Sequence, residues 1–258
     1  MSTRTHAQPA AAPGSPDMGA AQRHSDVAGM PRPPGTAASH RHSGMLSAGI
    51  HAAAVALPLV WSNRVLPALD LDVRGRTAAN TAFALAYTFA FQGNPRWISA
   101  HGLRAGAVAG GVVVAGYGAA LAIPPIRRQL AGSAHRGPAV STLEWAALHI
   151  PGGTVFSEEL VYRATLTPLL EESYGRLGRW LGALTFGLSH VRAARSADDP
   201  ILGTVAVTTT AGLVFDRLRL RTGSASAPAL LHLAINAGGA LAPFAARRGE
   251  GFLVGGRR

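Results

Sequence analysis

The sequence predicts an all-α protein: a polytopic transmembrane helix bundle of about seven membrane segments, preceded by a disordered N-terminal tail. Only 14% of its 258 residues are charged, against roughly 25% in typical soluble domains. The mean hydropathy is positive, at +0.18. The charged residues also fall in short clusters between long uncharged runs, and such runs are the signal for membrane-spanning helices.

The strong positive charge does not indicate nucleic-acid binding. The formal net charge is +11, and all 24 basic residues are arginines, spread over the N-terminal tail and many short loops. No basic face or known nucleic-acid motif occurs. Arginines that flank apolar runs favour membrane insertion and attract anionic headgroups. The expected partners are therefore membrane lipids and no nucleic acid, and the expected location is the cell membrane, crossed several times.

Cysteine is absent from the sequence. This excludes disulfides and thiolate zinc sites, so a metal would need histidine and carboxylate ligands.

Three regions are predicted. Residues 1–43 are rich in Pro, Gly, Ala, Ser and His without apolar periodicity, which is typical of disorder. They contain no apolar core of a cleavable signal peptide, so we expect the first spanning helix to act as an uncleaved signal. Residues 44–246 form the predicted transmembrane helical domain, and residues 247–258 form a short Arg-rich tail.

The first three predicted segments are residues 45–61, 77–92 and 105–126. An aromatic stripe with four-residue spacing in the second segment predicts a helix-packing face (Phe83, Tyr87, Phe91). Small residues in the third predict close helix contacts (Gly106, Gly110, Gly111, Gly116, Gly118). The pair Pro124-Pro125 should end this segment, with a basic loop to Arg136.

The fourth segment begins at Ser141, which has capping-box spacing to Glu144, and ends near Glu172. We expect residues 151–153, Pro-Gly-Gly, to kink or interrupt it one turn before Glu158.

Three further segments complete the predicted bundle. Residues 177–194 are short for a span, so this segment either tilts or stops partway and leaves His190 near one membrane face. Residues 201–215 and 228–246 follow. Arginine counts on alternate loops are nearly equal, and the positive-inside rule therefore gives no orientation.

The fourth segment carries three ionisable side chains close together, at Glu158, Glu159 and Arg163. A charged side chain at bilayer depth raises the free energy of membrane insertion by roughly 2.5–3.5 kcal/mol, and the apolar neighbours do not offset this cost for three such side chains. They must therefore face the interior of the bundle. Glu159 and Arg163 lie four residues apart and can pair on one helix face, which leaves Glu158 free to bind or activate water.

Two later segments provide further polar groups, at His190, His232 and Asn236. A shielded carboxylate has a raised pKa and serves as a general base near neutral pH. Asn236 shares a helix face with His232 and could hold an oxyanion. Glu158 with His190 and His232 would suit a catalytic zinc with an open position. A metal-free site is also physically possible, and the sequence leaves both open.

These residues belong to three motifs: Glu-Glu-x-x-x-Arg at 158–163, Phe-x-x-x-His at 186–190 and His-x-x-x-Asn at 232–236. In this order, on apolar segments, they resemble the motifs of the CPBP family, the Abi or CAAX-protease group of intramembrane endopeptidases. The run Arg-Thr-Gly-Ser at 221–224 is also similar to the family. The resemblance covers residues 142–240.

The resemblance implies an intramembrane endopeptidase acting on membrane-associated proteins or peptides. It implies Glu158 as the water-activating base, supported by Glu159 and Arg163, with His190, His232 and Asn236 building the site. Members are described as zinc metalloproteases or as glutamate-dependent proteases. The chain departs from the family pattern in two places, with Tyr162 where Phe is usual and Ala164 where Gly is frequent, and neither change removes a chemical group.

Two other function classes compete with a protease. A non-catalytic membrane scaffold or bacteriocin-immunity-type protein would use the polar cluster to lock helix packing. A proton-coupled transporter would use buried Glu, Arg and His as a relay, but transporters usually show internal repeats and none is evident. The oligomeric state is not predicted by the sequence.

Overall fold

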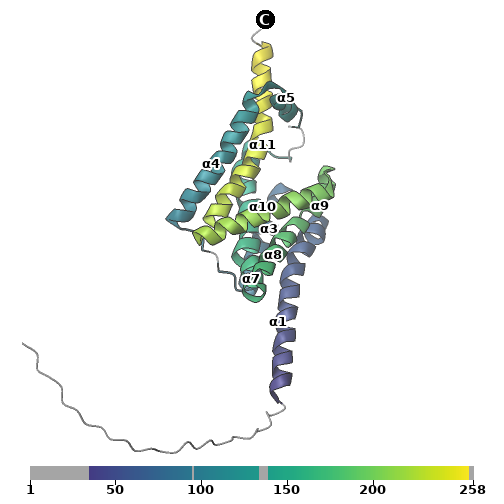
Figure 1. Ribbon diagram of the computed structural model, residues 1–258. Helices are drawn as coiled ribbons and strands as arrows, with labels where there is room; N and C mark the ends of the chain where they lie inside the picture. The colour runs from purple at the N-terminus through teal and green to yellow at the C-terminus, as the bar shows by residue number, and fades with distance from the viewer. Residues whose placement is uncertain (1–34, 95, 134–138, 256–258) are drawn as a thin grey trace, which may run out of the picture. The chain divides into compact units, whose positions relative to one another are not determined.

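The computed structural model describes residues 35–94, 96–133 and 139–255, and within these ranges the chain is helical without a β-strand (Figure 1). The predicted all-α class is therefore confirmed. Most of the predicted disordered tail, residues 1–34, lies outside the described residues, and residues 35–43 belong to the first helix. All contacts reported below lie within residues 44–258.

The helices follow one another with short connections. Three of the described elements are π-helical and are named η1, η3 and η4. In chain order the elements are α1 (Gly35–Val60), η1 (Trp61–Val65), α2 (Leu66–Ala68), α3 (Val73–Ala90), α4 (Ala100–Ala122), α5 (Pro124–Ser133), α6 (Thr142–Glu144), η3 (Trp145–Phe156), η4 (Glu159–Leu166), α7 (Thr167–Tyr174), α8 (Arg176–Leu188), α9 (Val191–Ala197), α10 (Ile201–Thr222) and α11 (Ser226–Gly255).

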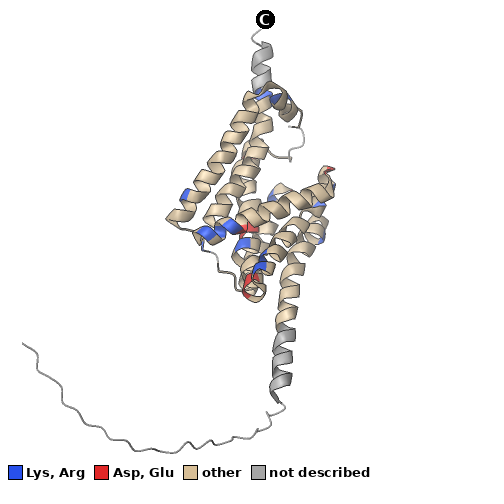
Figure 2. Ribbon diagram, in the orientation of Figure 1, with Lys and Arg blue, Asp and Glu red and all other residues tan. Residues whose placement is uncertain are grey.

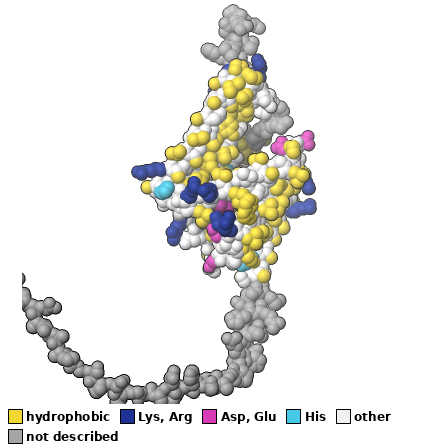
Figure 3. Space-filling model, in the orientation of Figure 1, with side chains coloured by type: hydrophobic (Ala, Val, Ile, Leu, Met, Phe, Trp, Pro, Cys, Tyr) yellow, Lys and Arg dark blue, Asp and Glu magenta, His cyan; other side chains and the backbone are white. Residues whose placement is uncertain are grey.

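Three helices of the described chain are long and apolar enough to cross a membrane: α4, α10 and residues 226–248 of α11. Their outer faces are apolar, and the side chains of Val108, Val112 and Leu202 are 70%, 69% and 86% exposed. Figure 3 shows hydrophobic side chains over this surface. Large exposed apolar faces indicate contact with lipid or a partner, which supports a membrane protein. The structure does not confirm seven spanning segments.

Helices α4 and α11 pack against each other and run parallel. Gly102, Gly106 and Gly110 are buried on α4, and a Cβ at Gly106 would meet the Ala227 backbone at 2.9 Å. Farther along, the Tyr117 hydroxyl donates to the Ile235 carbonyl at 3.0 Å. The glycines allow this close approach because they carry no side chain.

The predicted small-residue contacts of α4 are only partly correct. Gly106 and Gly110 contact α11, but a Cβ at the other three glycines would meet no atom within 4 Å (Gly111, Gly116, Gly118). Gly102, Gly106 and Gly110 follow one another at four-residue spacing and share the face of α4 that contacts α11. The other three glycines point away from this face.

The pair Pro124-Pro125 ends α4 as predicted, but the basic loop expected after it is wrong for residues 127–133. These residues belong to α5, which begins at Pro124. Proline is favoured in the first turn of a helix because the N–H that it lacks would have no partner there. Residues 134–138 of the expected loop lie outside the described residues.

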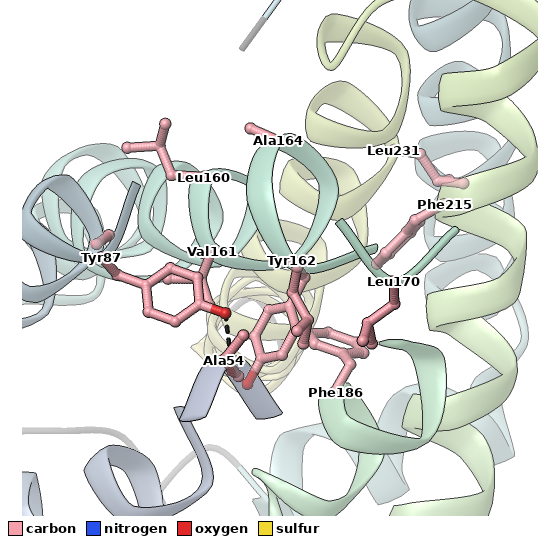
Figure 4. Packing of buried hydrophobic residues seen from close by; sticks show 12 residues of the cluster. Ala54, Tyr87, Leu160, Val161, Tyr162, Ala164, Leu170, Phe186, Phe215 and Leu231 are labelled. Atoms are coloured by element: carbon pink, nitrogen blue, oxygen red, sulfur yellow. Dashed lines mark hydrogen bonds between the residues drawn. The ribbon is translucent and has the colours of Figure 1, made fainter. Parts of the chain in front are cut away.

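The core of the bundle is an aromatic and aliphatic cluster around η4 (Figure 4). The predicted aromatic stripe of α3 contributes to it. Tyr87 is buried, its hydroxyl donates to the Ala54 carbonyl at 2.8 Å, and its ring lies 4.7 Å from that of Phe91. Phe83 stacks on Trp61 with ring centroids 4.5 Å apart. The stripe is a helix-packing face, and this core fixes the position of η4.

Candidate active site

The helix that carries the Glu-Glu pair runs from Thr142 to Tyr174, and π-helical turns widen it on both sides of Ser157 and Glu158. The sequence predicts a kink or an interruption at residues 151–153; the helix is not interrupted there, and these residues lie within the π-helix η3. A π-helix leaves main-chain groups that need partners, and it is frequent at functional sites.

Side chains from α3 and from the same helix bind the loosened carbonyls. Asn80 Nδ2 donates to the Gly153 carbonyl at 3.1 Å, and Ser157 Oγ donates to the Gly152 carbonyl at 2.9 Å. Trp61 Nε1 donates to Asn80 Oδ1 at 2.8 Å and so fixes the orientation of the amide. These bonds allow the widened helix to persist where the main chain would otherwise lack partners.

Glu159 lies at the centre of the buried polar cluster, and its side chain is 0% exposed. Its Oε1 lies 2.9 Å from His232 Nδ1, and its Oε2 lies 3.7 Å from Arg163 Nε. An ionised carboxylate only accepts hydrogen bonds, so the bond to His232 places a proton on Nδ1 and leaves Nε2 to face elsewhere. The predicted Glu159–Arg163 pair is present, and His232 is a second partner that spacing alone did not assign.

Arg163 is held mainly by aromatic rings. Its guanidinium carbon lies 4.2 Å from the Phe186 centroid and 4.9 Å from that of Phe215. None of its three nitrogens forms a hydrogen bond with another described residue. A desolvated guanidinium between ring faces gains about 2 kcal/mol from each close cation–π contact. Phe215 also stacks on His232 at 4.9 Å. This second role of Phe215 was missed in the sequence, where it reads as one more apolar residue of α10.

Glu158 differs from Glu159 in its surroundings. Its side chain is 26% exposed and lines a cavity of about 620 Å³. Its Oε2 lies 3.7 Å from His232 Nε2. With Nδ1 of a neutral His232 protonated, Nε2 and the Glu158 carboxylate are both acceptors, and a donor between them would satisfy both. The two adjacent glutamates thus divide into a buried ion-pair partner and a carboxylate that faces the cavity.

His190 lies in the turn between α8 and α9. α8 has 13 residues, fewer than a bilayer span needs, and the chain turns at His190 before α9 begins. His190 has φ −90° and ψ 0°, a sparsely populated conformation found at many active sites. Its Nδ1 lies 2.7 Å from the Phe186 carbonyl. A carbonyl only accepts, so Nδ1 carries the proton and Nε2 is a free acceptor.

Asn236 follows His232 by one helical turn on α11, and both line the same cavity as Glu158 and His190. The structure thus brings Glu158, His190, His232 and Asn236 to one cavity, whereas Glu159 and Arg163 lie buried behind it. Tyr162, one of the two departures from the family pattern, also lines the cavity and packs edge-on against Phe186 with centroids 5.0 Å apart.

Asn63, which sequence analysis missed, holds the turn that carries His190. Its Nδ2 donates to the Leu188 carbonyl at 3.1 Å, and its Oδ1 accepts from the Arg192 main-chain N–H at 2.8 Å. One amide therefore binds both sides of the turn. The only signal in the sequence is a polar residue at the end of an apolar run, and nothing there indicates its partners.

The three predicted zinc ligands line one cavity, but they are not arranged as a metal site. Among the described side chains, no group of three or more His, Cys, Asp or Glu is arranged to hold a metal ion. The Nε2 atoms of His190 and His232 are free to act as ligands, and Nδ1 of each is held by a hydrogen bond, as is common for metal-bound histidines. The tautomers suit zinc, but the three predicted ligands do not form a ligand set.

The arrangement is suited to move a proton beside a positioned carbonyl. A partly exposed carboxylate and an unprotonated imidazole nitrogen face each other across 3.7 Å, and an amide donor lies on the same cavity wall. These are the parts that general-base hydrolysis requires: a base, a second proton site and an oxyanion donor.

Comparison with known protein families supports the resemblance that the motifs indicated. The family model of the type II CAAX prenyl endopeptidases, Rce1-like, matches residues 140–238, a range that holds all six candidate residues. The match confirms the family resemblance indicated by the three motifs and implies endopeptidase activity. Neither the curated proteins nor the solved structures give a significant match.

Proposed function

We propose that this chain, with its Rce1-like type II CAAX prenyl endopeptidase domain at residues 140–238, hydrolyses peptide bonds of membrane-associated proteins or peptides with Glu158 as the general base. One observation carries the proposal. Of the two adjacent glutamates, the one without an arginine partner faces the cavity, together with both histidines and the asparagine.

In the first step a water molecule between Glu158 and His232 attacks the scissile carbonyl. Glu158 takes one proton from this water as the C–O bond forms, and the carbonyl becomes a tetrahedral oxyanion. The remaining O–H can be shared between Nε2 of His232 and the free Nε2 of His190, which together orient the water. General-base assistance of this kind contributes roughly 10²–10⁴-fold in rate.

In the second step the oxyanion collapses, and the C–N bond breaks. The Asn236 amide donates to the oxyanion, a contact worth about 3–4 kcal/mol in comparable sites. Glu158 returns its proton to the leaving nitrogen, which regenerates the carboxylate. The products are a new carboxylate and a new amine, and no redox partner or cofactor takes part in this scheme.

Glu159 and Arg163 serve as support in the proposal. Glu159 accepts from Nδ1 of His232 and so keeps Nε2 directed at Glu158. Arg163 is the cationic partner of Glu159 and is itself held between Phe186 and Phe215. A fixed tautomer of this kind is also the role of the acidic residue in catalytic triads.

The depth of the site favours substrates near the membrane surface. His232 follows the first residue of α11, Ser226, by about six positions, so it lies roughly 9 Å from that helix end at 1.5 Å per residue. This is within the outer third of a hydrocarbon core of about 30 Å. A substrate peptide that is held at the membrane by a lipid anchor reaches this depth without entering the bilayer completely.

The proposal is preferred over a scaffold or a transporter because of the cavity. A cluster that only locked helix packing is expected to have both carboxylates buried and paired, because a partly satisfied network is unfavourable, whereas Glu158 is partly exposed and has no arginine partner among the described residues. Zinc held by Glu158, His190 and His232 stays an alternative. Its test is elemental analysis of active protein after prolonged chelation, and full activity without metal would remove zinc from the account.

The experiment uses the full chain in lipid vesicles made with ¹⁸O-labelled water. The substrates are a prenylated C-terminal peptide, the same peptide without its lipid, and an unrelated soluble peptide. We expect cleavage of the anchored peptide, with one ¹⁸O atom in the new carboxylate by mass spectrometry. Absence of cleavage in all three, or cleavage without the label, would overturn the proposed hydrolysis.

A further inference from the structure

A second hollow, of about 440 Å³, lies between the start of α8 and the end of α10. Arginines from both helices line it: Arg176 and Arg179 from α8, and Arg217 and Arg221 from α10. It shares no lining residue with the cavity of the candidate active site. None of the proposed catalytic residues contributes to it, so its function is separate from hydrolysis.

The hollow carries excess positive charge. Glu171 binds Arg179 at 3.1 Å and Arg219 at 2.8 Å, and Asp216 lies 3.7 Å from Arg219. The other three lining arginines form no ion pair or side-chain hydrogen bond within the described residues (Arg176, Arg217, Arg221). Figure 2 shows Lys and Arg positions at the end of α10, and Figure 3 shows Lys and Arg side chains at the surface.

The same hollow has an apolar and aromatic side. Trp180 is 57% exposed and Leu220 is 42% exposed, and Leu213 completes this side. Tryptophan is enriched where the bilayer meets water, because its ring is amphipathic. α10 is a candidate membrane span that ends in this arginine-rich turn. The hollow therefore lies where headgroups are expected.

We propose that this hollow binds the phosphate headgroup of an anionic lipid. The guanidinium groups of Arg176, Arg217 and Arg221 provide planar, paired N–H donors that match phosphate oxygens. Trp180 and the two leucines contact the glycerol and the first acyl carbons. A free phosphate would use the arginines alone, and the apolar side distinguishes the two sources.

The test titrates the detergent-purified full chain with three soluble probes: dihexanoyl phosphatidylglycerol, dihexanoyl phosphatidylcholine and inorganic phosphate. Binding is followed by calorimetry at fixed ionic strength, because such contacts weaken with salt. We expect saturable binding of the phosphatidylglycerol, with at least tenfold weaker binding of the other two. Equal affinity for inorganic phosphate would overturn the lipid assignment, and absence of saturable binding would overturn the site.

Two variants and one control locate the binding. Arg217→Gln/Arg221→Gln should lower the phosphatidylglycerol affinity at least tenfold, and Arg217→Lys/Arg221→Lys should lower it less, because charge remains while the paired geometry is lost. Arg192→Gln/Arg195→Gln removes the same charge from exposed arginines of α9 and should stay within twofold of the parent. Circular dichroism verifies folding of each. Equal losses in the control and the α10 variant would contradict a discrete site.

Discussion

Arg163 is the residue whose role depends most on contacts that only the fold creates. It is 1% exposed, and it combines an ion pair to Glu159 with the ring faces of Phe186 and Phe215. Arg163→Ala should lower the free energy of unfolding by about 3–5 kcal/mol, because Glu159 is left buried without its cation. Thermal unfolding in detergent measures this loss.

Arg163→Lys is the matched comparison. The lysine keeps the charge but not the planar group that stacks on the two rings, so we expect a smaller loss of stability than in Arg163→Ala. Equal stability of the alanine variant and the parent would contradict the buried pair.

Asn63 provides a second prediction, on the geometry of His190. Asn63→Ala removes both hydrogen bonds that hold the turn, each worth about 0.5–1.5 kcal/mol. We expect kcat to fall about tenfold with KM nearly unchanged, because the displaced His190 orients water rather than substrate. Asn63→Asp keeps the acceptor for the Arg192 N–H and should recover part of kcat. An unchanged kcat in Asn63→Ala would show that Asn63 does not position His190 for catalysis.

At the scale of the helices, the contact of α4 with α11 depends on glycine positions. Gly106→Leu should weaken the packing, since its Cβ would already meet the Ala227 backbone at 2.9 Å and the leucine must push the helices apart. Gly116→Leu on the same helix meets open space and serves as the control. We expect a lower melting temperature for Gly106→Leu alone. Leucine has a higher helix propensity than glycine, so helix propensity alone would not lower either melting temperature. A similar decrease in both variants would show that the loss is not specific to the contact of α4 with α11.

The π-helix shows where sequence reasoning succeeds and where it ends. Residues 151–153 predicted an irregular backbone before Glu158, and the irregularity is present as a widened helix. Its form could not be predicted, because it depends on Asn80, which comes from another helix and binds the Gly153 carbonyl. Similarly, the four-residue spacing placed Arg163 beside Glu159, but the spacing could not provide His232 as the second partner of that carboxylate.

For the whole molecule, the predicted all-helical class follows from composition and apolar runs, which are local properties of the chain. The number of membrane-spanning helices cannot be predicted from these local properties alone. The 13-residue helix α8 is covered on parts of its surface by α7, through Gly182 against Thr167, and by α10, through Gly187 against Thr209. Neighbouring helices therefore shelter a segment that is too short to cross alone.

Because α4 and α11 run parallel, the starts of both helices should lie at one membrane face and their other ends at the opposite face. The Ala225 N–H donates to the Arg96 carbonyl at 2.8 Å, so the start of α4 lies beside the junction of α10 and α11. The absence of cysteine allows single-cysteine labelling with an impermeant maleimide. His101→Cys and Glu172→Cys should label from one side of sealed vesicles, and Gln129→Cys from the other. Labelling of all three from the same side would contradict α4 as a membrane span.

The central claim is that Glu158, and not merely the polar cluster around it, activates the water. The most direct measurement is the cleavage rate of a membrane-anchored peptide by the purified full chain in vesicles, for the parent and for Glu158→Gln. Glutamine keeps the shape of the side chain but cannot take a proton, so we expect a decrease of roughly 10²–10⁴-fold with unchanged thermal stability. Glu172→Gln, an exposed carboxylate of α7, is the matched control and should retain the parent rate. Near-parental cleavage by a folded Glu158→Gln protein would contradict the account.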